Sequence, residues 1–263
     1  IKQIIGGAQW YSTPSFDLTT ASLTASNIAS DAITTVKILN ANVTTAKIAD
    51  ANVTLAKLAD AVKQHQHEIF TASGTFTVPA SATTSTIFKV TCVGPGGGGS
   101  MWTTASGGGG AGATAIKWVS GLSASSTVTV TVGTGGAGGA SNTASGNPGS
   151  GSTSFGAHCI ASAGFGGVGN GTWSRGGAGG QLGTCTGDFK LGGGAGQSTN
   201  LGGSGNLQAG NGGSSSFGGG GLGETDTNGN ADAGIAPGAG GGGGYNSAGG
   251  AGANGVCIVE WVS

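Results

Sequence analysis

Short runs of glycine fill much of the sequence after residue 90 and constrain the fold more than any other feature. The chain has 263 residues, of which 61 are glycine. The main runs occupy residues 94–100, 106–113, 133–140, 175–181, 191–197, 217–223, 238–245 and 248–255. Glycine has no Cβ and loses more conformational freedom on folding than any other residue. An ordered structure of such runs must therefore be held by backbone hydrogen bonds rather than by side chains.

The glycine runs can be interpreted as an ordered bundle or as a flexible coil, which Gly-Ser composition alone would indicate. Collagen is excluded, because no Gly-X-Y register persists along the chain. Residues 135–140 (GGAGGA) do show a local period of three, which in a left-handed threefold helix lets neighbouring backbones approach closely and pair their amides and carbonyls. Single aromatic residues interrupt the runs and favour order: Phe155, Phe165, Trp173, Phe189 and Phe217.

Segments with strand-like patterns precede, interrupt and follow the glycine runs. They are residues 68–72, 75–78, 86–93, 113–119, 127–132, 154–162 and 256–262. Residues 127–132 alternate, which places Val128, Val130 and Val132 on one face. Because the outer strands come from opposite ends of residues 69–263, we expect a small antiparallel sandwich or sheet platform that clamps the glycine runs. Trp118 and Trp261 lie in strands and are expected in its core.

Residues 21–60 form four decapeptides: ASLTASNIAS, DAITTVKILN, ANVTTAKIAD and ANVTLAKLAD. Their third and eighth positions are aliphatic: Leu23, Ile33, Val43 and Val53, and Ile28, Ile38, Ile48 and Leu58. A period of ten fits neither a heptad nor a long strand, whereas a short extended piece followed by a Thr-capped turn fits it. One such unit cannot offset the entropy of ordering ten residues, about 1–2 kcal/mol each. Parallel copies wound about one axis can, so we expect a homotrimeric stalk rather than a flexible linker.

His65 and His67 follow the repeats in a neck at residues 61–68. In an extended strand, residues i and i+2 point to the same side. One chain then offers two imidazoles, and three chains around an axis offer six, enough for one octahedral first-row metal such as iron or nickel per trimer. The alternative is a pair of solvated histidines. Residues 1–20 are expected to be a connector from a longer fibre.

Charge and cysteine usage exclude several classes of protein. Charged residues make up 7% of the chain and the formal net charge is -1, whereas ordinary soluble domains are about 25% charged. Nucleic-acid binding needs clustered basic residues, so it is not expected. No apolar stretch approaches the ~18 residues that span a bilayer, so membrane insertion is not expected either. Cys92, Cys159, Cys185 and Cys257 lack metal-type spacing, and reduced thiols are favoured over two disulfides.

Several segments resemble phage tail-fibre proteins. TTAKIADANVTLAKLAD at residues 44–60 resembles their stalk repeats, and GTFTVP at 74–79, VTCVGPGGG at 90–98 and GANGVCIVE at 252–260 resemble the anchors of their glycine-rich C-terminal domain. Cys257 departs from the aliphatic residue usual there. The resemblance implies a mainly β homotrimer, with a fibrous stalk and a β-sandwich-like head containing polyglycine-II-type segments. It also implies a place on a virion tail fibre, or on a bacterial surface that carries phage-derived fibres, and supports the H-x-H metal site.

Glycine runs carry no side chains for recognition, so we expect the loops between them to contact a receptor. Aromatic and small polar groups suit a polysaccharide or an outer-membrane protein of a bacterium, and Trp, Tyr and Arg dominate binding hot spots. The alternative for each aromatic residue is burial at the ends of the bundle. The candidate residues are Trp102, Thr103, Trp173, Arg175, Asp188, Phe189, Lys190, Glu224, Asp226, Asn228, Tyr245 and Asn246.

An enzyme is the main alternative to an adhesin. A fibre-borne polysaccharide depolymerase needs two carboxylates about 5–9 Å apart, and Glu224 and Asp226 are the close acidic pair of the head. Their loop has no evident shielding pocket, which acid–base catalysis requires for a tuned pKa. A structural glycine-rich surface protein is the third class, although it has no need of a defined tip. The sequence therefore favours a binding protein, not an enzyme, whose receptor-binding head spans residues 69–263.

Overall fold

The computed structural model describes residues 4–5, 8–9, 28, 30, 33–34, 38, 43–44, 48, 64–141, 144–170, 173–199, 209–224 and 231–262. The chain divides into two compact units, Ile1–Val62 and Lys63–Ser263. The second unit is called the head below. Most of the decapeptide repeats lie outside the described residues. No helix within the described ranges is both long and apolar enough to cross a membrane.

The first unit contains a short hairpin and scattered described positions of the repeats. Strand β1 (Ile4–Ile5) pairs antiparallel with β2 (Ala8–Gln9). Backbone bends recur at the aliphatic third and eighth positions of the repeats. The side chains at these positions are 38–57% exposed in the single chain: Ile28, Ile33, Ile38, Val43 and Ile48. The described aliphatic side chains of the repeats are therefore partly exposed in a single chain.

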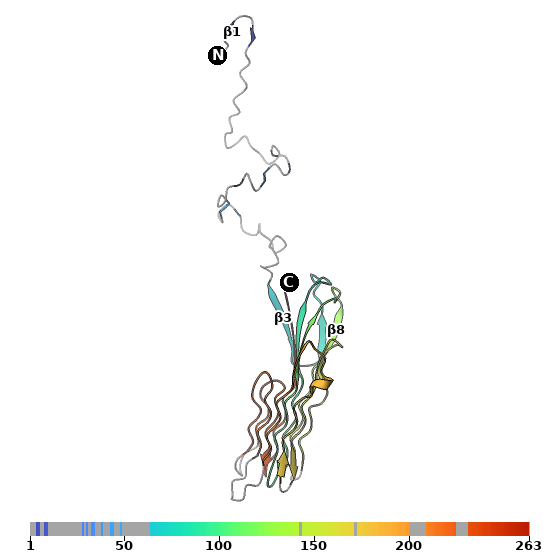
Figure 1. Ribbon diagram of the computed structural model, residues 1–263, viewed down its shortest axis with the longest axis vertical. Coiled ribbons are helices and arrows are strands. Elements are labelled where there is room, and N and C mark those ends of the chain that lie inside the picture. The colour runs from blue at the N-terminus through green and yellow to red at the C-terminus, as the bar shows by residue number, and fades with distance from the viewer. Residues whose placement is uncertain are drawn as a thin grey trace. The chain divides into compact units, whose positions relative to one another are not determined.

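Two antiparallel sheets form a sandwich in the head (Figure 1). The first has five strands in the order β13-β7-β5-β15-β3. They are β3 (His65–Phe70), β5 (Phe88–Val93), β7 (Thr114–Val119), β13 (Phe189–Leu191) and β15 (Val256–Val262). The second has four strands in the order β10-β9-β8-β4. They are β4 (Gly74–Thr77), β8 (Thr127–Thr131), β9 (Thr153–Phe155) and β10 (Cys159–Ala161).

This arrangement confirms the mainly β class, and most of the expected strands are present within a few residues. Residues 154–162 were expected to be one strand and instead form the β9–β10 hairpin. Its turn contains Gly156 with φ of 51°, a left-handed conformation that suits glycine. Residues 65–68, assigned from the sequence to the neck, belong to β3 and pair with β15.

The core lies between the two sheets. Phe76 of β4 contacts Phe88 of β5 and Trp261 of β15, with ring centroids 5.7 and 5.6 Å apart. The alternating valines of β8, and Val132 just after it, are buried, as their period of two predicted. Trp118 is the exception. The expectation that Trp118 lies in the core is wrong, because its register partner Lys89 places it on the face turned away from the second sheet, where it is 50% exposed.

The glycine runs extend from the sandwich as a hydrogen-bonded bundle (Figure 1). Successive residues of the run at 94–100 donate to different neighbouring runs. Gly97, Gly98 and Gly99 bond to the carbonyls of Gly110, Asn147 and Gly250 at 2.8, 2.9 and 2.9 Å. The same run accepts bonds from residues 136, 164, 167 and 241 of other runs. Its core is therefore backbone, as the ordered interpretation of the runs predicted.

Close approach explains why glycine is needed in this bundle. A Cβ added at Gly98 would overlap the carbonyl oxygen of Ala137, and one at Gly97 would overlap that of Phe165. Backbone groups this close exclude water, so each buried N–H must find a carbonyl in a neighbouring run. The sandwich fixes both ends of this segment of the chain, because β5 leads into the first run and β15 follows the last.

Candidate functional site

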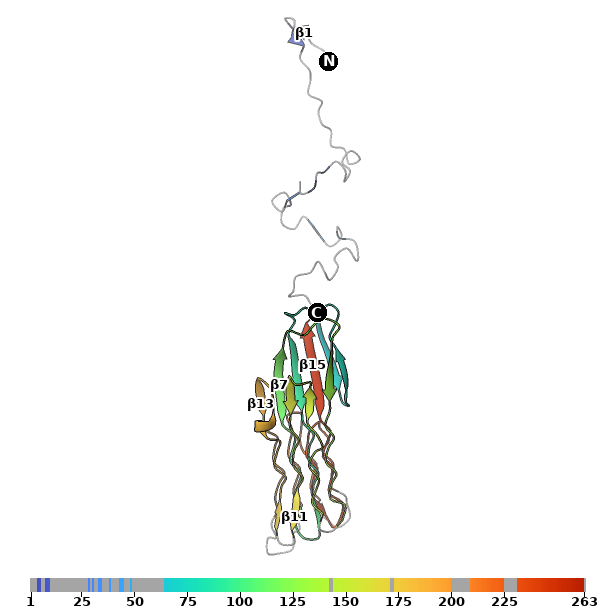
Figure 2. The same ribbon diagram turned by 90° about the vertical axis from the view of Figure 1, so that its right-hand side faces the viewer.

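Four short strands lie at the end of the bundle remote from the sandwich (Figure 2). Strand β6 (Met101–Trp102) pairs in parallel with β14 (Gly244–Tyr245), and this places Trp102 opposite Tyr245. The N–H of Asn246 donates to the carbonyl of Trp102 at 3.2 Å. Asn246 itself has φ of 52°, a conformation that Asn tolerates better than most residues. The loops that follow two distant glycine runs are thereby joined.

The other two strands form a hairpin beside β6. Strand β11 (Val168–Asn170) pairs antiparallel with β12 (Trp173–Arg175). Trp102 packs over Gly169, where an added Cβ would lie 3.0 Å from the indole ring. Trp173 is 46% exposed. The sequence-predicted residues that gather at this end are called the distal cluster: Trp102, Thr103, Trp173, Tyr245 and Asn246.

Glu224 also lies at this end, but its side chain is buried. Its carboxylate accepts hydrogen bonds from the backbone N–H of Tyr245, at 3.2 Å, and from the hydroxyl of Ser247. Only 7% of the residue is exposed. Glu224 therefore supports the Tyr245–Ser247 turn from inside rather than presenting its carboxylate at the surface. Asp226 and Asn228, its expected companions, lie outside the described residues.

A groove of about 290 Å³ runs along the flank of the bundle next to the β11–β12 hairpin. Its side chains come from two adjacent runs: Phe165, Val168, Arg175 and Gln181, with Gly166, Gly176 and Gly177 exposing backbone between them. Arg175 lies opposite Val168 in the hairpin and has no ion-pair partner among the described residues. Ser174 is buried between exposed Trp173 and Arg175, so these two share one side of β12. The sequence did not identify Phe165, Val168 and Gln181 as residues that line a groove with Arg175. Phe165 had been noted only as an aromatic residue that interrupts the glycine runs.

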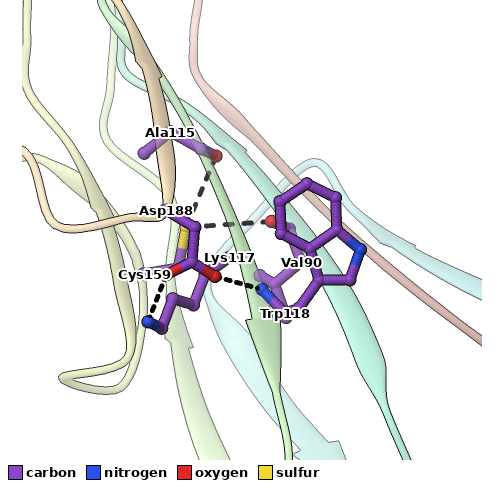
Figure 3. Close-up of polar contacts among 6 residues, drawn as sticks. All are labelled: Val90, Ala115, Lys117, Trp118, Cys159 and Asp188. Carbon is purple, nitrogen blue, oxygen red and sulfur yellow. Dashed lines mark hydrogen bonds and ion pairs between the residues drawn. The ribbon is translucent and has the colours of Figure 1, made fainter.

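Asp188, Phe189 and Lys190 do not join the distal cluster. They lie at β13, on the edge of the five-stranded sheet (Figure 2). The Asp188 carboxylate binds the ammonium of Lys117 at 2.5 Å and accepts the N–H of Trp118 at 3.0 Å (Figure 3). These two bonds lower the pKa of Asp188 from its ordinary value, Lys117 contributing most. The Lys190 ammonium donates to the carbonyl of Cys185 at 3.5 Å. Asp188 and Lys190 thus attach an edge strand.

His65 and His67 are exposed on one side of β3, as the i, i+2 spacing predicted. Nε2 of His65 lies 3.8 Å from Oε1 of Glu260. In the described part of a single chain, no three His, Cys, Asp or Glu side chains are grouped to hold a metal ion. Two imidazoles on one side of a strand are suitable metal ligands, and a complete site would need ligands beyond the described residues of one chain.

Comparison with known proteins places the head in a family. A search of curated proteins finds no match to this chain. The profile of the family described as "Glycine-rich domain" matches residues 71–262. That match covers more than half of the chain, from the residue after β3 to the last residue of β15. It therefore includes the sandwich, the bundle and the distal cluster, and we conclude that the chain belongs to the glycine-rich domain family.

Proposed function

We propose that this chain is the receptor-binding tip of a homotrimeric phage-type tail fibre, an adhesin that attaches to an outer-membrane protein or a polysaccharide of a bacterium. One observation carries the proposal. Trp102, Trp173 and Tyr245 come from three separate segments and are held together at the end of a backbone-bonded bundle. Large aromatic side chains on a rigid support bind with little loss of conformational entropy.

The groove beside Arg175 supports recognition of a glycan or an acidic peptide loop. Its exposed apolar residue Phe165 offers a surface for a sugar ring. The guanidinium of Arg175, which has no ion-pair partner among the described residues, suits a carboxylate. The bare backbone of Gly176 and Gly177 lets a ligand approach closely. Trp173 stands at the same side of β12, so the groove and the distal cluster form one continuous candidate surface.

The proposal is tested by adhesion of the purified full chain to host cells. We expect Trp173→Ala combined with Tyr245→Ala to weaken binding about tenfold or more. Ile235→Ala is the matched control, since Ile235 is 91% exposed and lies outside the distal cluster. Equal binding by both variants would overturn the proposal. Periodate treatment of the cells abolishes binding if the receptor is a polysaccharide, and protease treatment abolishes it if the receptor is a protein.

Binding rather than catalysis is the activity that we propose. The Glu224 carboxylate is engaged by Tyr245 and Ser247 inside the turn, which leaves it poorly placed for the two-carboxylate hydrolysis of a glycan. We expect the full chain to bind capsulated cells without releasing sugar. Release of reducing ends from capsule would instead favour a depolymerase, and failure to bind any cell would favour a structural surface protein.

A metal on the threefold axis is part of the same proposal. His65 and His67 of each copy would supply imidazoles to one iron or other first-row ion, which would tie the three chains together. Metal analysis of protein never exposed to a nickel resin tests this. We expect about one ion per three chains, and none in the His65→Ala, His67→Ala double variant. Wild-type protein without stoichiometric metal would contradict it. We propose no nucleic-acid partner and no membrane insertion.

A further inference from the structure

The outer face of the five-stranded sheet, turned away from the core, carries several exposed apolar side chains. Register places one row of side chains across it, from β13 to β3: Phe189, Ile116, Thr91, Ile258 and Ile69. Trp118 lies on the same face in the next row, and Val262 lies in the row beyond that. Ile69 is 53%, Phe189 50% and Val262 49% exposed. This surface is called the outer face below, and large exposed apolar patches of this kind mark interaction sites.

The second sheet has an outer surface of the opposite character. The exposed positions of β8 are Thr127, Thr129 and Thr131, and those of β4 include Thr75 and Thr77. Threonine is a favourable residue for a strand that faces water. The core that the two sheets share accounts for the apolar residues on the inner side of each sheet. It does not explain the apolar residues on the outer side of the five-stranded sheet. A strand buried on both faces is the pattern of a sheet that is covered.

The outer face is also hollowed and electrically balanced. A groove of about 360 Å³ crosses it, with Thr91, Ile116, Ile258 and Leu191 in the sheet and Phe217 beside them. Lys89 and Glu260 at its edge pair with each other at 2.8 Å. Their charges therefore need no charged partner, and an apolar surface of matching shape can cover them.

We infer that the outer face is where copies of this chain pack against one another around the fibre axis. This inference rests on the proposed function, because it takes the repeats to hold parallel copies together. Only residues 61–64 separate the last repeat from β3, and four residues span about 14 Å at most. Copies joined at residue 60 must therefore start their β3 strands close together.

Strand β3 is the first strand after the repeats, and it also contributes residues to the outer face. Ile69, His67 and His65 alternate along its outer side, in register with Ile258, Glu260 and Val262 of β15. The same packing that covers Ile69 would bring the imidazoles of several copies together. The distal cluster lies at the other end of the head (Figure 2) and remains available to a receptor. The outer face thus assembles the fibre tip while the distal cluster binds.

Labelling of single introduced cysteines in the purified full chain tests the inference. The four native cysteines are buried, so they give little background. Ile69→Cys and Val262→Cys replace residues that the described part of a single chain leaves exposed, so their protection would report contact with another copy. Thr129→Cys, on the exposed side of β8, is the matched control. We expect a maleimide to label the two outer-face variants about tenfold or more slowly than the control.

A second variant shows whether any protection comes from packing on this face. Adding Trp118→Arg to Ile69→Cys should restore labelling to the control rate, because a buried charge would force the copies apart. Equal labelling of Ile69→Cys and Thr129→Cys in the wild-type background would overturn the inference. If the protein has the mass of a trimer but Ile69→Cys and Thr129→Cys are labelled equally, the fibre proposal stands and the outer face is not the contact between copies. If the outer-face cysteines are protected but the Trp173→Ala, Tyr245→Ala variant adheres as well as the wild type, the proposed function is rejected. The outer face would then still be the contact between copies.

Discussion

Cys92 of β5 lies directly opposite Cys257 of β15, and their Sγ atoms are 3.7 Å apart in the core of the sandwich. The carbonyl of Cys159 lies 3.8 Å from the Cys92 sulfur. All four thiols are free and buried, in agreement with the expectation of reduced thiols. Hydrogen bonding with Cys159 and Cys257, together with burial, raises the pKa of the Cys92 thiol. The group behaves as a small apolar side chain rather than as a nucleophile.

Thiol reagents should therefore react slowly with the folded protein. All four cysteines should react readily once the protein is unfolded. Cys92→Ser places a hydroxyl in the same apolar site and should lower the free energy of unfolding by about 1–3 kcal/mol. Cys92→Ala is the control that removes the sulfur without adding a polar group. Denaturant unfolding monitored by tryptophan fluorescence measures both. Rapid labelling of the native protein would contradict the buried thiol cluster.

Alanine at a central glycine should disrupt the bundle. Gly98→Ala would force a Cβ into the carbonyl oxygen of Ala137, and we expect a loss of about 1–3 kcal/mol or more of stability. Gly219→Ala is the matched control, because no atom lies within 4 Å of its Cβ position and its φ is outside the left-handed region. That change should be neutral or slightly stabilising. Thermal unfolding distinguishes the two, and equal midpoints would show that the runs are not closely packed.

The pairing of β13 with β7 should weaken at acid pH. The pKa of Asp188 lies below its ordinary value of 3.8, chiefly through Lys117. The folded protein therefore gains from the charged carboxylate at every pH above 3.8, and that gain disappears as the pH falls through the lower folded pKa. Protection of the Phe189–Leu191 amides, taken relative to the intrinsic exchange rate at each pH, should fall over that interval. Asp188→Asn should exchange faster already at neutral pH and lose this acid dependence. Identical pH profiles for the two proteins would contradict the assignment.

Removing the Glu224 carboxylate should loosen the turn under the distal cluster. Glu224→Ala leaves the N–H of Tyr245 and the Ser247 hydroxyl without this acceptor and should cost about 1–3 kcal/mol. Glu224→Gln keeps an acceptor oxygen and should cost less. Hydrogen exchange at the Tyr245 amide reports the local effect directly. If both variants exchange as slowly as the wild type, the carboxylate does not support the turn.

The strands were predictable because their signal is local. Alternation in residues 127–132 identifies β8 and its buried face, and apolar segments at 86–93 and 256–262 identify β5 and β15. The same reasoning misplaced Trp118, because a strand with apolar residues on both faces does not reveal which side meets the core. It also grouped Asp188, Phe189 and Lys190 with the distal residues, since their position on a sheet edge depends on pairing with β7.

The sequence by itself determined that an ordered structure of the glycine runs must be held by their backbones and that strand-like segments enclose the runs. It also predicted that one repeat alone cannot cover its aliphatic residues. Each follows from the chemistry of neighbouring residues. Only the tertiary structure decided which runs pair, and hence that Trp102, Trp173 and Tyr245 lie at one end while Ile69, Phe189 and Val262 stay exposed on the outer face. A glycine run carries no side chains that distinguish one neighbour from another, so its sequence does not specify its neighbours. Hydrogen bonds between distant runs make that choice.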